Sequence, residues 1–600
     1  MAHKFKLDSI DFVNFGQLSM KELTIIIGPN NSGKSLAIKE LLHHTTRIGK
    51  NDKNIISDVS YSLPEAFSDA IENVNAPVHK HSQNNTLCFR VVAPKLDREH
   101  MGFVGTSTDE FNANYWGWTH QTKRDQYCSV FGAASVLYLS TELRISLANE
   151  ANNLKEEYEE SSILQRLYNL KPEDESKIKR HVKEVFGKDI HLDFTVPQKL
   201  CFRVDSEISN IPPDPRDARP VLAKIPRLDD QGDGIRSYVG MCTALLSVVR
   251  PLTLVDEPEA FLHPPQATHI GRLIADCCGA DNQIVVSTHS PEVLRGLMEA
   301  KKDTRLLRIQ RTAIGSKITA LEPEILREIV DHPLSGSSQA LEGLFAEAVV
   351  VVEGDADGRI YAACLSQLKV SLGIQFVVAD NKQTVAKLVN VYKHLGVPCT
   401  GIVDIDLLSV ETEFTACCRE LHISEEEILR LNLLRRGIAL EVDNQSPIET
   451  SQSTAVVLKE LELQHIELTI SMEQNDETRQ RLTLEQIYKS GRRLADSTKK
   501  WKSIKANGIF ELSDDAVGKF NEVADRLSEI GICIAPFGEL EAIFSEFGLK
   551  YRGNKREWFV DALKFISNLS ISDDSNLGRF LRKFVGALGG SIPDTSWKTR

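Results

Sequence analysis

The sequence lacks any hydrophobic run that approaches the roughly 20 apolar residues of a membrane-spanning helix. Its first residues, Met1 to Asp8, also lack the apolar segment of a secretion signal. No Cys-x-x-C pair occurs, and the 11 cysteines are an odd number that includes the adjacent pairs Cys277-Cys278 and Cys417-Cys418. This pattern does not suit a disulfide framework or a zinc site. We therefore expect a cytoplasmic protein with reduced thiols and no membrane partner.

Positive charge is also scarce, since 71 Lys and Arg residues stand against 84 Asp and Glu residues, which gives a net charge of −13. A protein coated in basic surface is excluded. Nucleic acid remains a candidate partner, because a nuclease needs only a local basic groove and its metal-binding carboxylates add negative charge. The length of 600 residues predicts two to four domains.

A phosphate-binding loop follows the β-branched run Leu23 to Ile27, and a helical pattern follows the loop. Its spacing, G-x-x-x-x-G-K-S, turns backbone N–H groups toward phosphates, while the lysine supplies a charge and the serine hydroxyl binds Mg²⁺. The residues predicted to hold a nucleotide are Gly28, Asn30, Asn31, Ser32, Gly33, Lys34 and Ser35.

Two later strands also end in polar groups. The apolar run from Leu252 ends in Asp256 and Glu257, which are suited to hold Mg²⁺ through water and to polarise the attacking water. The run Gln283 to Val286 precedes His289, which we expect near a γ-phosphate. A glycine-rich turn with Gly232 and Gly234 opens another helix, a geometry that binds anions.

These motifs, in this order, resemble the ABC-type ATPase head of the SMC and RecF families over residues 1 to about 320. The resemblance makes Lys34 and Ser35 the Walker A residues, Asp256 and Glu257 the Walker B pair, and His289 the switch histidine. The glycines at 232 and 234 replace the usual Leu-Ser-Gly-Gly-Gln signature. No long heptad region interrupts the head, which counts against the SMC proteins themselves.

We predict an ATPase domain over residues 1–330. Its charged, helical segment at about 145–187 either pairs with a second subunit or packs within the chain. A linker at 331–345 and a second α/β domain at 346–600 follow, and the second domain contains a helical insertion at about 407–530. The densest basic stretch, from Arg492 to Lys505, either lines DNA or forms a solvated helix face.

Acidic residues follow two predicted strands of the second domain. Glu353 and Asp357 come after the run Ala348 to Val352, and Asp404 and Asp406 come after Cys399 to Val403. Because ligands of such sheets bind at the carboxyl ends of the strands, these acids predict a site for one or two Mg²⁺ ions. Mn²⁺ is the alternative metal.

The pattern resembles the TOPRIM domain, in which Glu353 and Asp357 match V-E-G-x-x-D and Asp404 and Asp406 match D-x-D. Later family elements are best matched by Glu539 and Glu541, as further metal ligands, and by Lys555, as the basic catalytic residue. The resemblance implies catalytic roles for Glu353, Asp404, Asp406 and Lys555 here, and for Glu257 and His289 in the ATPase domain.

An ABC-type P-loop domain followed by a TOPRIM α/β domain with helical insertions resembles the OLD (overcome lysogenisation defect) nuclease family. The resemblance implies ATP binding and hydrolysis, metal-dependent cleavage of DNA, a prokaryotic or phage origin and a homodimer or larger homo-oligomer. It also implies a role in anti-phage defence, with a retron reverse transcriptase or a helicase as partner. The alternative is a RecF- or SMC-like repair ATPase whose TOPRIM domain binds DNA without cutting it.

Overall fold

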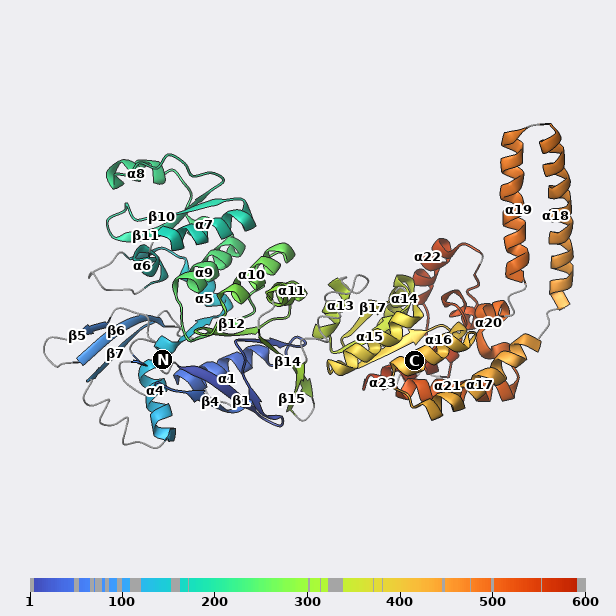
Figure 1. The fold of residues 1–600 in the computed structure, drawn as a ribbon, viewed down its shortest axis with the longest axis horizontal. Helices are drawn as coiled ribbons and strands as arrows, with labels where there is room; N and C mark the ends of the chain where they lie inside the picture. The colour runs from blue at the N-terminus through green and yellow to red at the C-terminus, as the bar shows by residue number, and fades with distance from the viewer. Residues whose placement is uncertain are drawn as a thin grey trace, which may run out of the picture. The chain divides into compact units, whose positions relative to one another are not determined.

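The computed structural model places the chain in two compact units, Met1–Phe345 and Ala346–Arg600 (Figure 1). Within the described residues, the model contains no helix of the length and apolarity that a bilayer crossing requires. The described residues are 5–47, 53–64, 69–70, 78–80, 86–93, 100–107, 120–152, 162–170, 172–300, 303–312, 315–321, 338–370, 372–379, 381–444, 448–474, 476–497, 501–551, 553–572 and 574–590.

A six-stranded sheet forms the centre of the first unit, in the order β15-β14-β3-β13-β12-β8. All its strands run parallel except β15, which pairs antiparallel with β14. The strands β3, β12 and β13 are buried at every residue, as expected for strands covered on both faces. The strands are β3 (Leu23–Ile27), β8 (Val136–Leu139), β12 (Leu252–Asp256), β13 (Gln283–Ser287), β14 (Thr304–Thr312) and β15 (Gly315–Leu321).

This order positions the predicted nucleotide site. The strand β13 lies between β3 and β12, so the loops after these three parallel strands meet at one edge of the sheet. The described helices of the unit before residue 300 are α1 (Lys34–Thr46), α4 (His120–Ser135), α5 (Thr141–Leu147), α6 (Ile163–Tyr168), α7 (Pro172–Phe186), α8 (Pro215–Leu222), α9 (Asp233–Ser247), α10 (Pro264–Cys277) and α11 (Pro291–Glu299).

Three small antiparallel sheets complete the first unit. They have the orders β2-β1-β4, β10-β11-β9 and β5-β6-β7. Their strands are β1 (Lys6–Phe12), β2 (Gly16–Ser19), β4 (Ile56–Ser62), β5 (Val78–Lys80), β6 (Thr86–Ala93), β7 (His100–Ser107), β9 (Ala151–Asn152), β10 (Asp189–Asp193) and β11 (Lys199–Asp205).

The predicted linker is partly structured. Residues 331–337 lie outside the described residues, but α13 (Ser338–Glu342) and the 3₁₀ turn η2 (Gly343–Phe345) follow. Leu341 and Leu344 are fully buried, and the Leu344 carbonyl accepts a hydrogen bond from Arg308 Nε at 3.2 Å. Apolar burial therefore joins residues 338–345 of the predicted linker to the first unit, and the rest of the predicted linker lies outside the described residues.

The second unit contains a four-stranded parallel sheet in the order β17-β16-β18-β19. The chain passes from β16 outward to β17 and returns to β18 on the other side of β16. The strand order therefore reverses between β16 and β18, which is where sheets of this type bind ligands. The strands are β16 (Ala348–Val352), β17 (Ile374–Val378), β18 (Cys399–Val403) and β19 (Ile532–Ile534).

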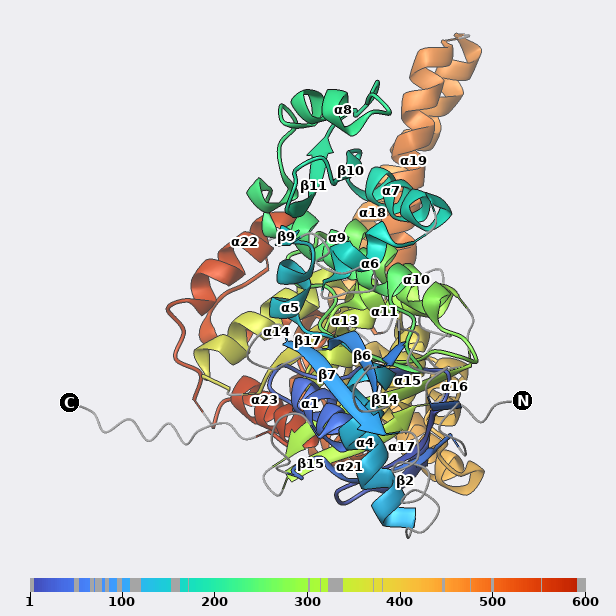
Figure 2. The ribbon, with the colours of Figure 1, turned by 90° about the vertical axis from the view of Figure 1, so that its left-hand side faces the viewer.

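Helices connect these strands, and most of them lie between β18 and β19. Before this segment come α14 (Asp355–Gln367) and α15 (Lys382–His394), and after it come α22 (Lys555–Ile566) and α23 (Asn576–Ala587). Between β18 and β19 the chain forms α16 (Glu411–Glu420), α17 (Glu425–Asn444), α18 (Ile448–Glu473), α19 (Glu477–Ser497), α20 (Lys502–Asn507) and α21 (Asp514–Glu529). The helices α18 and α19 lie side by side as a hairpin (Figure 1), and they overlap along the line of sight in Figure 2.

Gly401 in β18 allows α15 to approach the sheet closely. A Cβ at this position would lie 2.5 Å from Val385 Cγ1 on α15 and 2.8 Å from Ile532 Cδ1 on β19. Any larger residue would push the helix and the neighbouring strand apart, close to the strand end that carries Asp404.

We predict that Gly401→Ala destabilises the second unit by ~1–3 kcal/mol, because the added methyl group overpacks this contact. Gly518→Ala is the control, since a Cβ there meets nothing within 4 Å and alanine favours the helix α21. Differential scanning calorimetry of the two variants measures the effect. Equal melting temperatures for both variants and the parent chain would contradict it.

Candidate functional site

Two glycines shape the phosphate-binding loop between β3 and α1. Gly28 has a φ of 148°, and a Cβ there would lie 2.0 Å from the carbonyl oxygen of Ile309 on β14. Gly33 has a φ of 105°, and its Cβ would lie 2.6 Å from Ile55 Cδ1. Both conformations and both spaces suit glycine alone, so the loop's curvature depends on these two residues.

Lys34 points into this loop. Its Nζ donates hydrogen bonds to the carbonyl oxygens of Gly28 at 3.0 Å and of Pro29 at 2.8 Å. Burial lowers the pKa of Lys34, although the carboxylates of Glu257, Glu259 and Asp256 act to raise it. The cation is thus held beside the acidic strand ends with few polar partners of its own.

The other predicted loop residues differ in exposure. Asn30 and Asn31 are exposed, whereas Ser32 is buried. In the part of the chain that the structure describes, Ser32 Oγ has no hydrogen-bond partner. An unpartnered buried hydroxyl inside a cradle of backbone N–H groups fits the phosphates of a nucleotide.

Asp256 lies at the end of β12 and is buried. It accepts hydrogen bonds from the hydroxyl groups of Ser287 and Ser35. Burial raises its pKa, and these two hydrogen bonds oppose the shift. The pairing of Ser35 with Asp256 is the donor set that Mg²⁺ bound to a nucleotide requires, so these two residues fit that ion.

Glu257 and His289 face each other across the ends of β12 and β13. His289 Nδ1 lies 3.6 Å from Glu257 Oε1 and 3.0 Å from Glu259 Oε1. The hydrogen bond with Glu257 raises the pKa of His289, and the same bond lowers the pKa of Glu257. Glu257 has a φ of 48°, which is a strained backbone conformation for this residue type and is common at functional sites.

Glu259 was missed by the sequence analysis. Its Oε1 accepts the backbone N–H of His289 at 2.7 Å, and its Oε2 accepts the Thr288 hydroxyl at 2.9 Å. Burial raises its pKa. Glu259 therefore fixes both the backbone and the ring of His289.

Arg144 was also missed. It is fully buried and donates hydrogen bonds to the carbonyl oxygens of Asp256 at 2.6 Å, Glu257 at 2.9 Å and Leu139 at 3.3 Å. Burial lowers the pKa of Arg144 to about 10. The arginine thereby joins the ends of β8 and β12. A charged residue five positions after the buried strand β8 was the only signal in the sequence.

The two predicted signature glycines lie at the N-terminus of α9. Gly232 precedes the helix, and a Cβ there would meet nothing within 4 Å. A Cβ on Gly234 would lie 2.7 Å from the carbonyl oxygen of Phe261, in the loop that follows β12. The glycines therefore stand beside the loop after the acidic pair and not in the loop around Lys34.

In the second unit, Glu353 and Asp404 meet at the point where the strand order reverses. The backbone N–H of Asp404 donates to Glu353 Oε1 at 3.1 Å. Burial raises the pKa of Asp404 to about 8, with further increases from Glu353, Asp357 and Asp406. Burial also raises the pKa of Glu353. The strand ends thus crowd several carboxyl groups into a buried space.

The later acids reach the same edge of the sheet. Lys555 Nζ lies 2.7 Å from Glu541 Oε1 and 3.8 Å from Glu539 Oε2. Burial raises the pKa of Asp357, with a contribution from Glu541, while Lys555 acts to lower it. Asp357 also accepts the backbone N–H of Gly354 at 2.9 Å. Glu541 and Lys555 therefore lie near Asp357.

Asp406 differs from its neighbours because two lysines neutralise it. Lys382 Nζ pairs with Oδ1, and Lys505 Nζ pairs with Oδ2. Burial alone would raise the pKa of Asp406, but the two lysines lower it below the usual value. Lys505 belongs to the predicted basic stretch, so its charge was visible in sequence. Nothing in the sequence marked Lys382.

Close backbone packing fixes Lys505. Its carbonyl oxygen accepts the N–H of Glu539 at 2.6 Å. A Cβ on Gly538, which has a φ of 94°, would lie 2.1 Å from that same oxygen. A Cβ on Gly508 would lie 2.2 Å from the carbonyl oxygen of Pro536. The segment 504–508 is therefore clamped against 536–539.

Whether this edge of the second unit's sheet fits a divalent cation depends on the side chains that it offers as ligands. Among the described residues, no three His, Cys, Asp or Glu side chains converge as a group that could hold a metal ion. Glu353 and Asp404, whose pKa values are raised, are carboxyl groups that a nearby cation would stabilise in the charged form, and the ammonium groups of Lys382 and Lys505 pair with Asp406. Glu353, Asp404 and Asp406 are the residues that would hold it.

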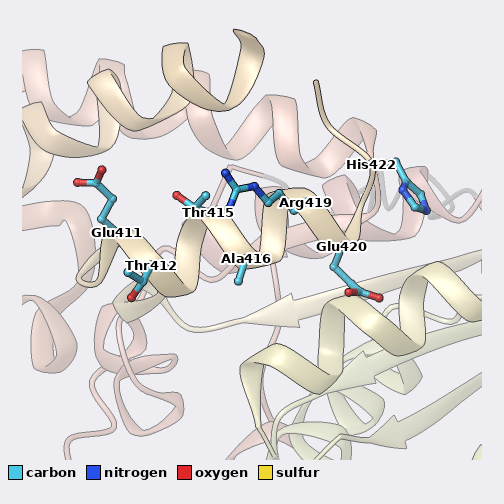
Figure 3. Close-up of a pocket in the computed structure, with 7 residues that line it drawn as sticks. All are labelled: Glu411, Thr412, Thr415, Ala416, Arg419, Glu420 and His422. Carbon is cyan, nitrogen blue, oxygen red and sulfur yellow. The ribbon is translucent and has the colours of Figure 1, made fainter. Parts of the chain in front are cut away.

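A hollow of about 860 Å³ lies along α16, away from the carboxylates at the strand ends. Glu411, Thr415 and Arg419 project from one side of the helix, and Thr412, Ala416 and Glu420 project from the other (Figure 3). Glu411 also pairs with Arg435 and Arg436. The hollow contains none of the predicted site residues.

Two protein-family models match the chain. The AAA_21 model, described as "AAA domain, putative AbiEii toxin, Type IV TA system", matches residues 127–295. The model "Overcoming lysogenization defect protein-like, TOPRIM domain" matches residues 344–406. The chain joins an AAA-type ATPase domain to an OLD-like TOPRIM domain. The predicted fold class and the predicted resemblance to the OLD nucleases are confirmed.

Two curated proteins are similar to part of this chain. The Old nuclease of Escherichia phage P2 is 26% identical over 26% of this chain and 28% of its own length. The OLD nuclease of Thermus scotoductus is 28% identical over 30% of this chain and 37% of its own length. The matched regions thus span about a third of these relatives.

A solved SMC head domain from Thermotoga maritima is 16% identical, with a TM-score of 0.26, over 54% of this chain and 100% of that chain.

We predict that Arg144→Lys destabilises the first unit by ~1–3 kcal/mol, because a single ammonium group leaves buried carbonyl oxygens at the ends of β8 and β12 without donors. Arg216→Lys is the matched control, since the Arg216 side chain is 89% exposed. Urea unfolding of both variants measures the difference. A stability loss of equal size in the two variants would refute the bridging role of Arg144.

We also predict that Asp404→Asn makes the stability of the second unit less dependent on pH. The folded pKa of Asp404, about 8, exceeds its ordinary value of 3.8, so the folded state binds the additional proton between these pH values. The contribution of the Asp404 carboxyl group to the free energy of unfolding is fully present below about pH 4 and is lost as pH rises toward 8. Melting temperatures between pH 5 and pH 8.5 test this. A parent chain and variant with parallel pH curves would contradict the assignment.

Proposed function

We propose that the chain is an ATP-binding and ATP-hydrolysing, metal-dependent DNA endonuclease of the OLD type. The observation that carries the proposal is the meeting of Glu353 and Asp404 at the reversal point of a parallel sheet, with the N–H of Asp404 bound to Glu353. The activity of the curated relatives, named as nucleases, supports the same reaction for this chain.

In the ATPase domain, the loop from Gly28 to Ser35 binds the phosphates, and Lys34 contributes its charge to them. Ser35 and Asp256 would hold Mg²⁺, which neutralises charge on the phosphates when bound. Glu257 orients and polarises the attacking water, and His289, fixed by Glu259, contacts the γ-phosphate.

In the TOPRIM domain, the carboxylates Glu353, Asp404 and Asp406 would hold one or two Mg²⁺ ions, or Mn²⁺ in their place. Such ions activate water and stabilise the leaving oxygen of a phosphodiester. Asp357, Glu539 and Glu541 complete the acidic edge, and Lys555 carries positive charge toward the scissile phosphate. Lys382 and Lys505 supply further positive charge at the same edge.

The wider biological role follows from the family resemblance. We propose cytoplasmic action in anti-phage defence, by a homodimer or larger homo-oligomer in which two ATPase domains pair. A retron reverse transcriptase or a helicase is the partner that the resemblance suggests. The phage and bacterial sources of the two curated relatives support a function in the conflict between phage and host.

One observation favours a second function, in which the TOPRIM domain binds DNA without cutting it. Lys382 and Lys505 both neutralise Asp406, and among the described residues no three ligating side chains converge. A repair ATPase with such a domain would retain ATP hydrolysis and DNA binding.

The experiment that separates the two functions is cleavage of supercoiled plasmid, with Mg²⁺ or Mn²⁺ and with or without ATP. We predict that the parent chain nicks or linearises the plasmid and that Asp404→Asn with Asp406→Asn lowers the rate at least 100-fold, because neutral amides no longer hold the cations. Asp355→Asn is the control, since this exposed acid of α14 pairs with Arg359 and lies outside the carboxylate group.

Cleavage that persists in the double variant would overturn the assignment of these acids. Absence of cleavage in every lane, with ATP hydrolysis intact, would support the repair ATPase. The lanes with ATP also show whether the nucleotide activates or inhibits cleavage.

A further inference from the structure

The helices between β18 and β19 leave an unusual amount of apolar surface uncovered. Of the 21 large hydrophobic residues that are exposed in the described chain, 12 lie on α17, α18 and α19. Scattered exposed hydrophobic residues are normal on a monomer, but a concentration on one element marks an interaction surface. Nine of these residues belong to the α18–α19 hairpin alone.

The seam inside the hairpin does not account for this apolar surface. The buried positions of the seam include small polar side chains, namely Ser471, Thr483 and Ser490. Gln464 Nε2 donates to Ser490 Oγ at 3.2 Å across the seam, and Gln480 Nε2 donates to the Ser471 carbonyl oxygen at 3.0 Å. Half-buried apolar residues such as Leu468 and Ile487 share the spacing of these polar groups, whereas the nine exposed apolar residues of the hairpin lie outside the seam.

An apolar stripe runs along the outside of α18. It consists of Val456, Leu463, Ile466 and Ile470, which are 56%, 67%, 55% and 41% exposed. Their spacings of seven, three and four residues are those of the a and d positions of a coiled coil. A helix with two such faces, one paired and one exposed, is suited to pack against a further helix.

The charges of α18 and α19 indicate which helix packs against the stripe. The sequence of α18 contains five glutamates and one lysine. The sequence of α19 contains five arginines and lysines against three acids. A two-fold axis between two hairpins places the acidic α18 of each copy beside the more basic α19 of the other. The hairpin is therefore complementary in charge to a second copy of itself.

The size of the hairpin also suits such a pairing. The 26 residues of α18 extend over about 39 Å. Two helices side by side present a face about 20 Å wide. The resulting face of roughly 800 Å² for each copy is what a stable, specific interface buries. On α19, Leu484 and Tyr488 are 53% and 69% exposed and lie one helical turn apart, where they meet the stripe of the other copy.

We propose that the α18–α19 hairpin is a self-association surface, through which two copies of the chain form an antiparallel four-helix bundle. The stripe Val456, Leu463, Ile466 and Ile470 of one copy packs against α19 of the other. This contact is independent of the pairing of ATPase domains, because it uses only the insertion in the TOPRIM domain.

Photo-cross-linking of the full chain tests the proposal. The photoreactive residue p-benzoylphenylalanine replaces Leu463, and ¹⁵N-labelled and unlabelled protein are mixed before irradiation without nucleotide. We expect cross-linked peptides that combine a labelled with an unlabelled chain and that map to α19. Mass spectrometry identifies both the partner peptide and its isotope. The same probe at Thr469, an exposed position off the stripe, is expected to give at least ten-fold less product.

A second pair of variants checks the role of the stripe. Ile466→Glu with Ile470→Glu should reduce the mixed-isotope product at least ten-fold, since four buried charges would oppose each other in the bundle. His465→Glu with Thr469→Glu adds the same charges at exposed positions off the stripe and should leave the product unchanged. Circular dichroism confirms equal helix content, which is expected because all four positions are exposed.

The proposal fails if Leu463 cross-links only within one chain, for example to the exposed apolar residues Leu429 and Leu433 of α17. It also fails if no mixed-isotope product forms, or if the two double variants behave alike. Loss of plasmid cleavage has no bearing on this outcome, so the result is separate from the proposed nuclease activity.

Discussion

Negative charge at the ends of buried parallel strands is the constraint on which both sites depend. Parallel strands direct their carboxyl ends to one edge, and the sequence places acids at the ends of three of them, β12, β16 and β18. These acids are largely removed from water, where an unpaired carboxylate is costly. In each unit, Lys and Arg side chains from other helices and loops place positive charge beside these acids. Lys34 and Arg144 do so in the first unit, and Lys382, Lys505 and Lys555 do so in the second.

The two units stabilise their buried strand-end acids in different ways. In the first, most partners are fixed by backbone groups, since Arg144 binds carbonyl oxygens and Glu259 binds the N–H of His289. In the second, the pKa values of neighbouring acids move apart. Two lysines lower the pKa of Asp406, while burial, together with the surrounding carboxyl groups, raises the pKa of Asp404 to about 8. In the proposed nuclease, such divergence would let one edge both bind cations and exchange a proton.

Sequence patterns predicted the parts of this arrangement that follow from local rules. A buried strand followed by an acid, as at Glu353 and Asp404, is visible without knowledge of the fold, and so is the spacing of the phosphate-binding loop. The sheet orders explain why these residues meet. Arg144, Glu259 and Lys382 could not be predicted, because their roles depend on which strands become neighbours. Leu341 and Leu344, within the predicted linker, find a buried site in the first unit, a tertiary effect that the glycine- and serine-rich composition obscured.

The close backbone packing around Lys505 fixes the point at which the segment between β18 and β19 returns to the sheet. The chain leaves the sheet after Asp406 and returns through residues 504–508, which are held against 536–539 by contacts that exclude even a methyl group at Gly538 or Gly508. The α18–α19 hairpin lies between these two anchors, and none of the strand-end carboxylates or their lysine partners belongs to it. The hairpin can therefore lengthen, shorten or change its surface during evolution while the lysine opposite Asp406 stays in place, so that recognition and chemistry are able to diverge at different rates within one domain.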